Sequence, residues 1–309
     1  MKKLLLFAGI LVLLLYLLFC PLQALEAARE GLNLWLNTLI PTFLPFVILT
    51  NILTGTGMIE KMLNPMKYFW KNVWGISPSG SYALLTGWLC GYPMGAKVTS
   101  DLYEVGKISR SEAEYLLTFV NQPSPAFINT YVVNICMKKQ VSVGKTFLII
   151  YLSAFITMII FRYLYISKDV TDSKQTKIET SISSSPGALL DVSIMNGFET
   201  ITRLGGYILL FSILAAAVKE YWNKGELSCC ILLGFMEMTT GIRALSIIPF
   251  PTEIKYLCIV PVTVMGGLCV AAQTRSIVSR KLSLRLYYSA KILSATVSVI
   301  LILVFAKII

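Results

Sequence analysis

The hydropathy pattern consists of long apolar runs that are interrupted at a few places by glycine, proline and charged residues. The first uncharged run extends from Leu4 to Cys20 and follows Met-Lys-Lys. It exceeds the apolar core of roughly 7–15 residues typical of a signal peptide and approaches the roughly 17–25 residues that cross a bilayer. We therefore expect residues 1–22 to form an N-terminal transmembrane helix.

A long polar segment, residues 167–186, divides the rest of the chain. Its many serine and threonine residues are typical of a flexible linker. The same order of elements occurs on both sides: an amphipathic piece, an apolar span, two apolar pieces with a break, and a final span. Such self-similarity predicts two repeats, residues 23–166 and residues 187–309.

The hydropathy pattern predicts five elements in each repeat. In the first repeat they are an amphipathic helix over 23–39, a span over 40–59, broken pieces around Gly91 and Pro123, and a span over 143–166. In the second repeat they are 187–203, 204–221, broken pieces around Glu237 and Gly266, and a span over 284–306.

We interpret the first broken piece of each repeat as a re-entrant hairpin, because the segments on either side of its break are too short or too polar to cross the membrane. Residues 79–90 lead to a tip over 91–95, and the equivalent hairpin covers 227–250. The second broken piece, 111–137 or 253–275, is long enough to cross, with proline or glycine unwinding its middle. Each repeat then crosses three times, so the second is inverted relative to the first.

The distribution of positive charge agrees with this topology. With the N-terminus inside, fourteen lysines and arginines fall on the inner side and eight on the outer side, in the sense of the positive-inside rule. The sequence thus predicts an all-α polytopic membrane protein with two inverted repeats, each with a re-entrant helical hairpin and a broken transmembrane helix. We expect it to be a multi-pass protein of the cell membrane, in contact with the lipid bilayer.

Composition supports a membrane protein and weakens the case for an enzyme. Of 309 residues, 56% are hydrophobic and 14% charged, and the mean hydropathy of +0.71 lies outside the soluble range. The lack of histidine excludes imidazole ligands and His-activated nucleophiles, and the seven cysteines form no C-x-x-C pair. We expect no catalysis, no cofactor and no metal. The net charge of +11 reflects basic residues that flank apolar runs, so nucleic acid is not an expected partner.

Four breaks at membrane depth predict a shared polar cavity, because unpaired backbone groups are tolerated there only inside protein or beside water. Half-helix N-termini at the breaks would offer N–H groups and positive dipole ends to an anion. Lys97 and Arg243 would add cationic charge beside the two tips. The expected substrate-binding residues are Gly91, Tyr92, Pro93, Gly95, Lys97, Asn121, Gln122, Pro123, Ser124, Glu237, Thr239, Thr240, Arg243, Gly266, Gly267 and Gln273.

These residues also have a purely structural interpretation. The tip over 91–95 could be an ordinary interhelical turn, and Lys97 could extend to the membrane interface. Glu237 could pair with Arg243. The amide side chains could bridge helices, a common use of amides in membranes.

Several motifs resemble the YlbJ family of sporulation integral membrane proteins, also called stage V sporulation protein V, which carry a nucleoside-recognition gate domain. They are Pro41-Thr-Phe-Leu-Pro-Phe46, Gly91-Tyr-Pro-Met-Gly-Ala-Lys97, Ser111-Glu-Ala-Glu114, Asn121-Gln-Pro-Ser-Pro-Ala-Phe127, Glu237-Met-Thr-Thr-Gly241 and Gly266-Gly-Leu-Cys-Val-Ala-Ala-Gln273. That family is more distantly similar to the concentrative nucleoside transporters. Here, however, Tyr92-Pro-Met94 replaces the polar cluster with which those transporters bind nucleoside.

The resemblance implies movement of dipicolinic acid across the mother-cell-derived membrane around the developing spore. We therefore interpret the sequence as a transporter of this small dicarboxylate that works by alternating access. One alternative is a gate-domain transporter of a nucleoside or another small anion without a sporulation role. Another is a non-transporting scaffold that recruits partners through the polar linker. Other sporulation membrane proteins and a second copy of the chain are further candidate partners.

Overall fold

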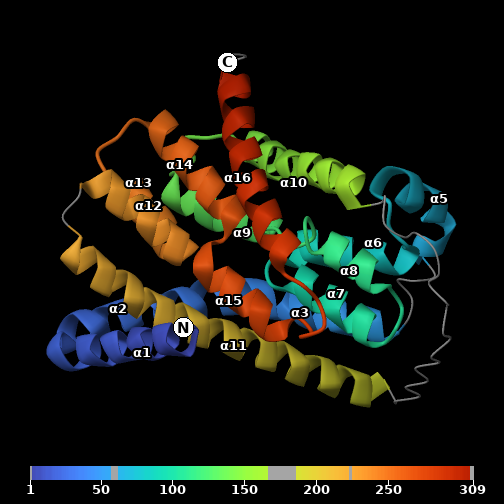
Figure 1. Cartoon of the computed structure of the whole chain (residues 1–309), viewed down its shortest axis with the longest axis horizontal. Helices are drawn as coiled ribbons and strands as arrows, with labels where there is room; N and C mark the ends of the chain where they lie inside the picture. Colours follow the sequence, from blue (N-terminus) through green and yellow to red (C-terminus); the bar gives the residue numbers. More distant parts are fainter. Residues whose placement is uncertain (1, 57–61, 166–185, 223–224, 307–309) are drawn as a thin grey trace.

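The computed structural model describes residues 2–56, 62–165, 186–222 and 225–306, and the regular structure in these ranges is helical (Figure 1). The all-α prediction is therefore confirmed for the described part of the chain. Four stretches there are long and apolar enough to cross a membrane: Val143–Tyr163, Pro186–Tyr221, Thr252–Ile277 and Arg285–Phe305. A fifth candidate is the helix pair Gly9–Phe19 and Pro21–Asn37, which is bent by 109°.

The N-terminal part of the chain is a series of joined helices. α1 (Lys2–Phe19) ends before Cys20, and α2 (Pro21–Leu34) continues through the π-helical turn η1 (Trp35–Leu39) into α3 (Ile40–Gly55). The predicted N-terminal helix, amphipathic helix and span correspond to these elements. Residues 57–59 of the predicted span lie outside the described residues.

The helix α11 (Pro186–Tyr221) is continuous over 36 residues and packs along α2 and α3. The predicted division into 187–203 and 204–221 is wrong, because the helix passes through Gly205 without a break. The Trp35 ring packs on Gly205, and its Nε1 donates to the Ile201 carbonyl at 2.9 Å. The predicted linker covers 167–186. Its residues 167–185 lie outside the described residues, and its last residue, Pro186, begins α11.

Two helical hairpins lie at the predicted positions. Hairpin 1 joins α6 (Pro78–Cys90) to α7 (Met94–Glu104), and hairpin 2 joins α12 (Glu226–Met236) to α13 (Met238–Ile247) at Glu237. Each arm has 10 to 13 residues and is therefore about 15–20 Å long, which is shorter than a hydrocarbon core of about 30 Å. Their re-entrant placement and the inversion of the repeats stay predictions.

Both predicted helix breaks are present. Break 1, residues 121–124, separates α8 (Arg110–Leu116) from α9 (Pro125–Phe127), which continues as the π-helix η4 (Ile128–Cys136). The prolines at 123 and 125 cannot donate backbone hydrogen bonds, which ends the helix here. Break 2 is Gly266, whose left-handed φ of +77° separates α14 (Thr252–Met265) from α15 (Gly267–Ile277).

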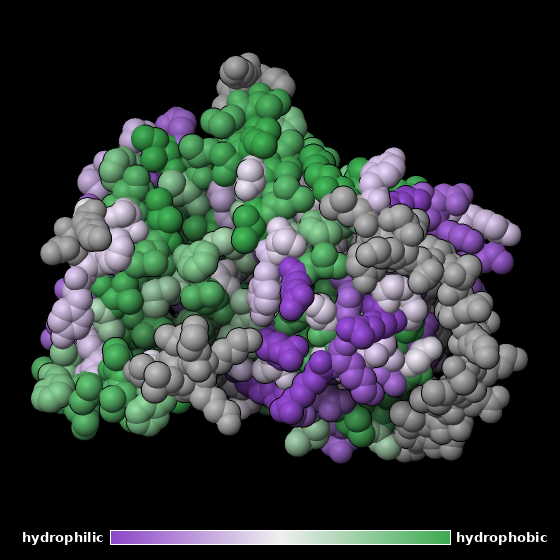
Figure 2. All heavy atoms as spheres, in the orientation of Figure 1, coloured by the Kyte–Doolittle hydropathy of each residue, from purple (hydrophilic) through white to green (hydrophobic). Residues whose placement is uncertain are grey.

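The last helix of each half, α10 (Val143–Tyr165) and α16 (Arg285–Ala306), packs against the other, and α16 also packs against α14 (Figure 1). The short turns η2 (Asn64–Met66), α5 (Lys67–Phe69) and η3 (Trp70–Trp74) precede hairpin 1. Figure 2 shows hydrophobic side chains over α12, α14 and α16, whereas hydrophilic ones gather where α15, α7 and α11 come together. On this face, the hydrophilic side chains therefore gather around these three helices.

Candidate functional site

Hairpin 1 packs directly on break 1 through three glycines. A Cβ on Gly95 would lie 2.5 Å from the Val120 carbonyl oxygen and 2.9 Å from the Gly87 Cα. A Cβ on Gly91, which has a φ of +83°, would lie 2.7 Å from the Ser124 nitrogen. Since all these neighbours are backbone atoms, the hairpin approaches the unwound segment only because these positions lack side chains.

Hairpin 2 packs on break 2 in the same manner. A Cβ on Gly267 would lie 2.8 Å from the Phe235 carbonyl oxygen and 2.9 Å from that of Gly234. A Cβ on Gly241 would overlap the Gly234 backbone. Each hairpin therefore holds the backbone of the break in its own half.

A small cavity, which we call the central chamber, lies between the hairpin tips and the breaks. Its volume is about 30 Å³, which is enough for a water molecule but for little more. Its wall includes six of the predicted substrate-binding residues, namely Tyr92, Pro123, Ser124, Glu237, Thr239 and Gln273. Apolar side chains, among them Phe43, Phe127 and Ile208, complete the wall.

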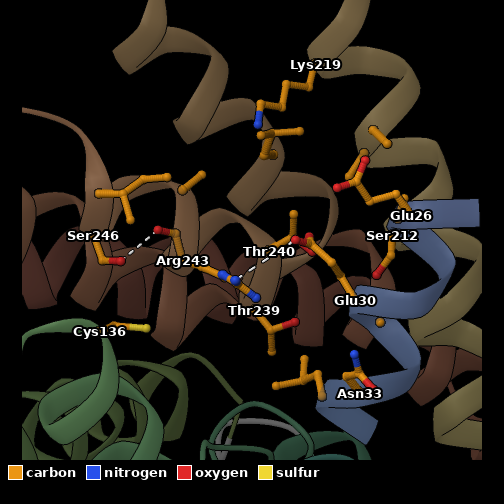
Figure 3. A pocket seen from close by; sticks show the side chains of 18 of the residues that line it. Glu26, Glu30, Asn33, Cys136, Ser212, Lys219, Thr239, Thr240, Arg243 and Ser246 are labelled. Carbon is orange, nitrogen blue, oxygen red and sulfur yellow. Dashed lines mark hydrogen bonds and ion pairs between the residues drawn. The ribbon is translucent and has the colours of Figure 1, made fainter. Parts of the chain in front are cut away.

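A large vestibule of about 1,200 Å³ adjoins the chamber at Thr239, which lines both cavities. Figure 3 shows its charged wall: Glu30 on α2 faces Arg243 on α13, and Lys219 extends from α11. The Arg243 Nη2 atom lies 4.0 Å from the Glu30 Oε1 atom, and the arginine side chain is 63% exposed. Thr240 also lines this vestibule.

A small vestibule of about 250 Å³ adjoins the chamber at Gln273. Pro93 and Lys97 of hairpin 1 line it, and two ion pairs border it. The Lys97 Nζ atom lies 2.8 Å from Asp101, and Arg203 lies 2.6 Å from Glu199. Lys97 therefore faces this water-accessible vestibule, in agreement with its predicted place beside the first tip.

One face of α11 follows all three cavities. Asn196 to Tyr207 border the small vestibule, Leu204 and Ile208 the chamber, and Ser212 to Glu220 the large vestibule. From residue 200 to residue 216, α11 rises about 24 Å, a distance close to the hydrocarbon thickness of about 30 Å. The two vestibules thus border opposite ends of α11, with the chamber between them.

Glu237 caps the second arm of hairpin 2. Its carboxylate accepts hydrogen bonds from the backbone N–H of Thr239 at 3.1 Å, from the Thr239 hydroxyl at 2.5 Å and from the backbone N–H of Thr240 at 2.7 Å. The side chain is 2% exposed. The alternative in which Glu237 pairs with Arg243 is therefore wrong, because the carboxylate turns inward to the helix terminus and the arginine faces the vestibule.

This cap also corrects the expectation that every half-helix N-terminus is open to a solute. Glu237 covers the N-terminus of α13, and the Ser124 hydroxyl accepts from the Phe127 backbone N–H at 3.1 Å at the start of α9. By contrast, no side chain of the described residues caps α7 or α15. The open N-termini are therefore those beside Pro93 and Gly266.

The predicted amides are buried, and each has an oxygen without a partner among the described residues: Asn121 Oδ1, Gln122 Oε1 and Gln273 Oε1. Asn121 bridges to α15, since its Nδ2 donates to the Thr274 hydroxyl at 3.0 Å. Gln273 Nε2 donates to the Cys269 sulfur at 3.2 Å. Of the three amides, Gln273 alone lines the cavities described above. The structure therefore places Asn121 and Gln122 in packing positions, as it does Gly91, Gly95, Gly266 and Gly267.

Lys291 on α16 was not among the predicted residues, although it is 5% exposed and sits beside the chamber. Its Nζ donates to the Asn121 carbonyl and to the Val264 carbonyl, the latter at 3.1 Å, and lies 4.9 Å from the centre of the Tyr92 ring. A sequence signal existed: Lys291 is the one charged residue between Arg285 and Lys307. A lysine in a membrane helix costs up to about 3 kcal/mol on insertion scales and marks a functional site by default.

A second residue that the sequence did not indicate is Tyr151 on α10. Its hydroxyl lies 3.1 Å from the Trp88 carbonyl and 3.0 Å from the Pro123 carbonyl, so it can donate to either. The last helix of each half thus supplies a donor to backbone carbonyls that the breaks leave without helical partners.

Together, the helical fold and the apolar candidate spans indicate an integral membrane protein. The chain is 23% identical over 321 aligned residues to the sporulation integral membrane protein YlbJ of Bacillus subtilis (strain 168), and the match covers 93% of this chain and 78% of that protein. This similarity to YlbJ is of modest identity but extends over nearly the whole chain, in agreement with the resemblance of the motifs. No family model and no solved structure matches it.

Proposed function

We propose that this protein is a transporter that moves a small organic anion across the membrane by alternating access, and that dipicolinate is its substrate during endospore formation. The observation that carries the proposal is the pair of vestibules at opposite ends of α11, which meet at one chamber between the hairpin tips and the breaks. A scaffold has no need of such a path.

The size of the chamber supports alternating access over an open channel. About 30 Å³ is far below the roughly 300–1,000 Å³ of pockets that hold small molecules. A solute therefore passes only when the hairpins move away from the breaks, first toward one vestibule and then toward the other. Short hairpin arms that contact the breaks through glycine are suited to such a movement, because few side chains interlock there.

The cationic side chains of the two vestibules are the proposed partners of an anionic solute, which would compete for them with an equal number of carboxylates. Each vestibule contains cationic side chains, Lys97 and Arg203 in the small one and Lys219 and Arg243 in the large one. Hydrogen bonds between such groups and a carboxylate are about twice as strong as neutral ones. The uncapped N-termini of α7 and α15 add positive dipole ends near the chamber.

The biological setting is proposed from the relative and from the resemblance. The Bacillus subtilis relative is called a sporulation integral membrane protein, and dipicolinate is the substrate that the family resemblance implies. On this proposal the chain works in the mother-cell-derived membrane around the developing spore.

The test is uptake of labelled dipicolinate into proteoliposomes that contain the purified protein. We expect saturable uptake that excess unlabelled dipicolinate abolishes and a nucleoside does not. Arg243→Ala should lower uptake about tenfold, as expected for the loss of a charge-assisted hydrogen bond of roughly 1.5 kcal/mol. Arg280→Ala removes the same charge from an exposed position outside the three cavities and serves as the matched control.

Three results would redirect the proposal. Uptake of a nucleoside or of another anion in place of dipicolinate would favour a different substrate. Absence of any uptake, together with loss of the sporulation phenotype on deletion of 168–185, would favour the scaffold. Equal uptake by the Arg243→Ala and Arg280→Ala variants would exclude Arg243 from the path of the solute.

A further inference from the structure

The surroundings of the Lys291 ammonium group have the features of a cation-binding site. Its contacts are the Asn121 carbonyl of break 1, the Val264 carbonyl just before break 2, and the face of the Tyr92 ring at the tip of hairpin 1. The Tyr92 hydroxyl in turn donates to the Thr263 carbonyl. Break 1, the end of α14 and the tip of hairpin 1 are far apart in the sequence, and all three meet at the Lys291 nitrogen atom of α16.

These partners favour positive charge for a physical reason. The Val264 carbonyl belongs to the last turn of α14, where carbonyls lack helical partners and form the negative end of the helix dipole. The Asn121 carbonyl lies in an unwound segment. An aromatic face attracts a cation within about 6 Å. Oxygen ligands of this kind bind a small cation, whether or not a side chain carries it.

The site holds one positive charge without a carboxylate among the described residues. Glu237 uses its carboxylate on Thr239 and Thr240. Glu114, on α8, accepts from the Ser283 backbone N–H at 3.0 Å, just before the start of α16. The ammonium group is thus the counter-charge of backbone dipoles, and its loss leaves a set of carbonyl oxygens facing a buried space.

We infer that Lys291 is a tethered cation: its ammonium group fills a cation site built by both breaks and the tip of hairpin 1, and so holds the central chamber closed. Because Tyr92 lines the chamber and covers Lys291, the chamber opens only when these contacts separate. The description of the chamber as a transport site rests on the proposed function. The cation site itself does not, because it follows from the contacts of Lys291.

Two substitutions separate the charge of Lys291 from its bulk. Lys291→Ala leaves the carbonyl oxygens and an empty space, whereas Lys291→Met fills the space with an uncharged chain of similar length. The probe is methylammonium, which carries the missing group, and tetramethylammonium is the control cation, because it cannot donate a hydrogen bond. The measurement is the thermal unfolding of the purified protein, with no transported solute present.

We expect the Ala variant to unfold below the wild type and to regain about 2–4 °C at a methylammonium concentration about ten times its dissociation constant. The Met variant should show no such gain, and tetramethylammonium should act on neither. Lys291→Arg, which keeps the charge and the donors, should unfold closer to the wild type than either variant. In proteoliposomes, methylammonium should restore uptake to the Ala variant alone.

The inference is overturned if methylammonium does not stabilise the Ala variant, if it stabilises the Met variant equally, or if the Ala variant stays unfolded at saturating methylammonium. It is also overturned if the Ala variant is as stable as the wild type without any added cation. Stabilisation of the Ala variant by methylammonium in a protein that takes up no dipicolinate would uphold the cation site and refute the proposed substrate. The two proposals therefore fail separately.

Discussion

The contact between hairpin 1 and break 1 can be tested by adding a single methyl group at Gly95. The Cβ of Gly95→Ala would lie 2.5 Å from the Val120 carbonyl oxygen, whereas ordinary contact begins at 3.4 Å, so the two segments must separate by about 0.9 Å. The neighbouring atoms belong to the backbone and cannot rotate away. Residue 95 is helical, so alanine brings no backbone strain and the effect is steric alone.

Overpacking of this kind costs typically about 1–3 kcal/mol, and we expect the upper end because no side chain can yield. Alanine recovers up to about 1 kcal/mol through its better helix propensity. The net loss of about 2 kcal/mol should lower the unfolding temperature by about 4–8 °C. The displacement also moves the Asn121 carbonyl, the next along the chain, away from Lys291, so uptake should fall as well.

The assay is thermal unfolding in detergent combined with proteoliposome uptake. Gly206→Ala is the matched control, because Gly206 is helical and a Cβ there meets nothing within 4 Å. It should raise the unfolding temperature by a few degrees at most and leave uptake unchanged. If both alanine variants unfold within about a degree of each other, the close approach of hairpin 1 to break 1 does not exist and the reasoning fails.

Two further predictions concern polar groups at the chamber. Gln273→Leu removes a buried amide oxygen that has no partner among the described residues, so we expect equal or higher thermal stability. We also expect a roughly tenfold higher KM for uptake, corresponding to one lost hydrogen bond to the solute. An unchanged KM would place Gln273 outside the path. Glu237→Ala leaves two buried donors and one partly buried donor without their acceptor and should destabilise the protein by about 2–4 kcal/mol in thermal unfolding, whereas Arg243→Ala should leave stability unchanged. Equal losses of stability in the Glu237→Ala and Arg243→Ala variants would indicate that Glu237 and Arg243 form an ion pair after all.

Much of the backbone plan follows from local chemistry and was predicted correctly. The interruption at 121–124 could be read from Pro123 and Pro125, because proline ends a helix in any surroundings. Gly266 and the tip over 91–95 gave similarly local signals. The boundary expected near residue 204 was wrong, because glycine permits a break without enforcing one, and the Trp35 ring packed on Gly205 favours the continuous helix.

The partners of individual side chains could not be predicted in this way. Glu237 and Arg243 are separated by six positions, and the spacing is compatible with an ion pair until the fold turns one toward a helix terminus and the other toward water. The contacts of Lys291 could not be predicted either, since the carbonyls that accept from it lie 170 and 27 residues away. Hydropathy and backbone restrictions act within a few residues, so spans and helix breaks can be predicted from the sequence. The occupant of a cation site is decided by which distant backbone groups the packed helices bring together, and that depends on the tertiary structure.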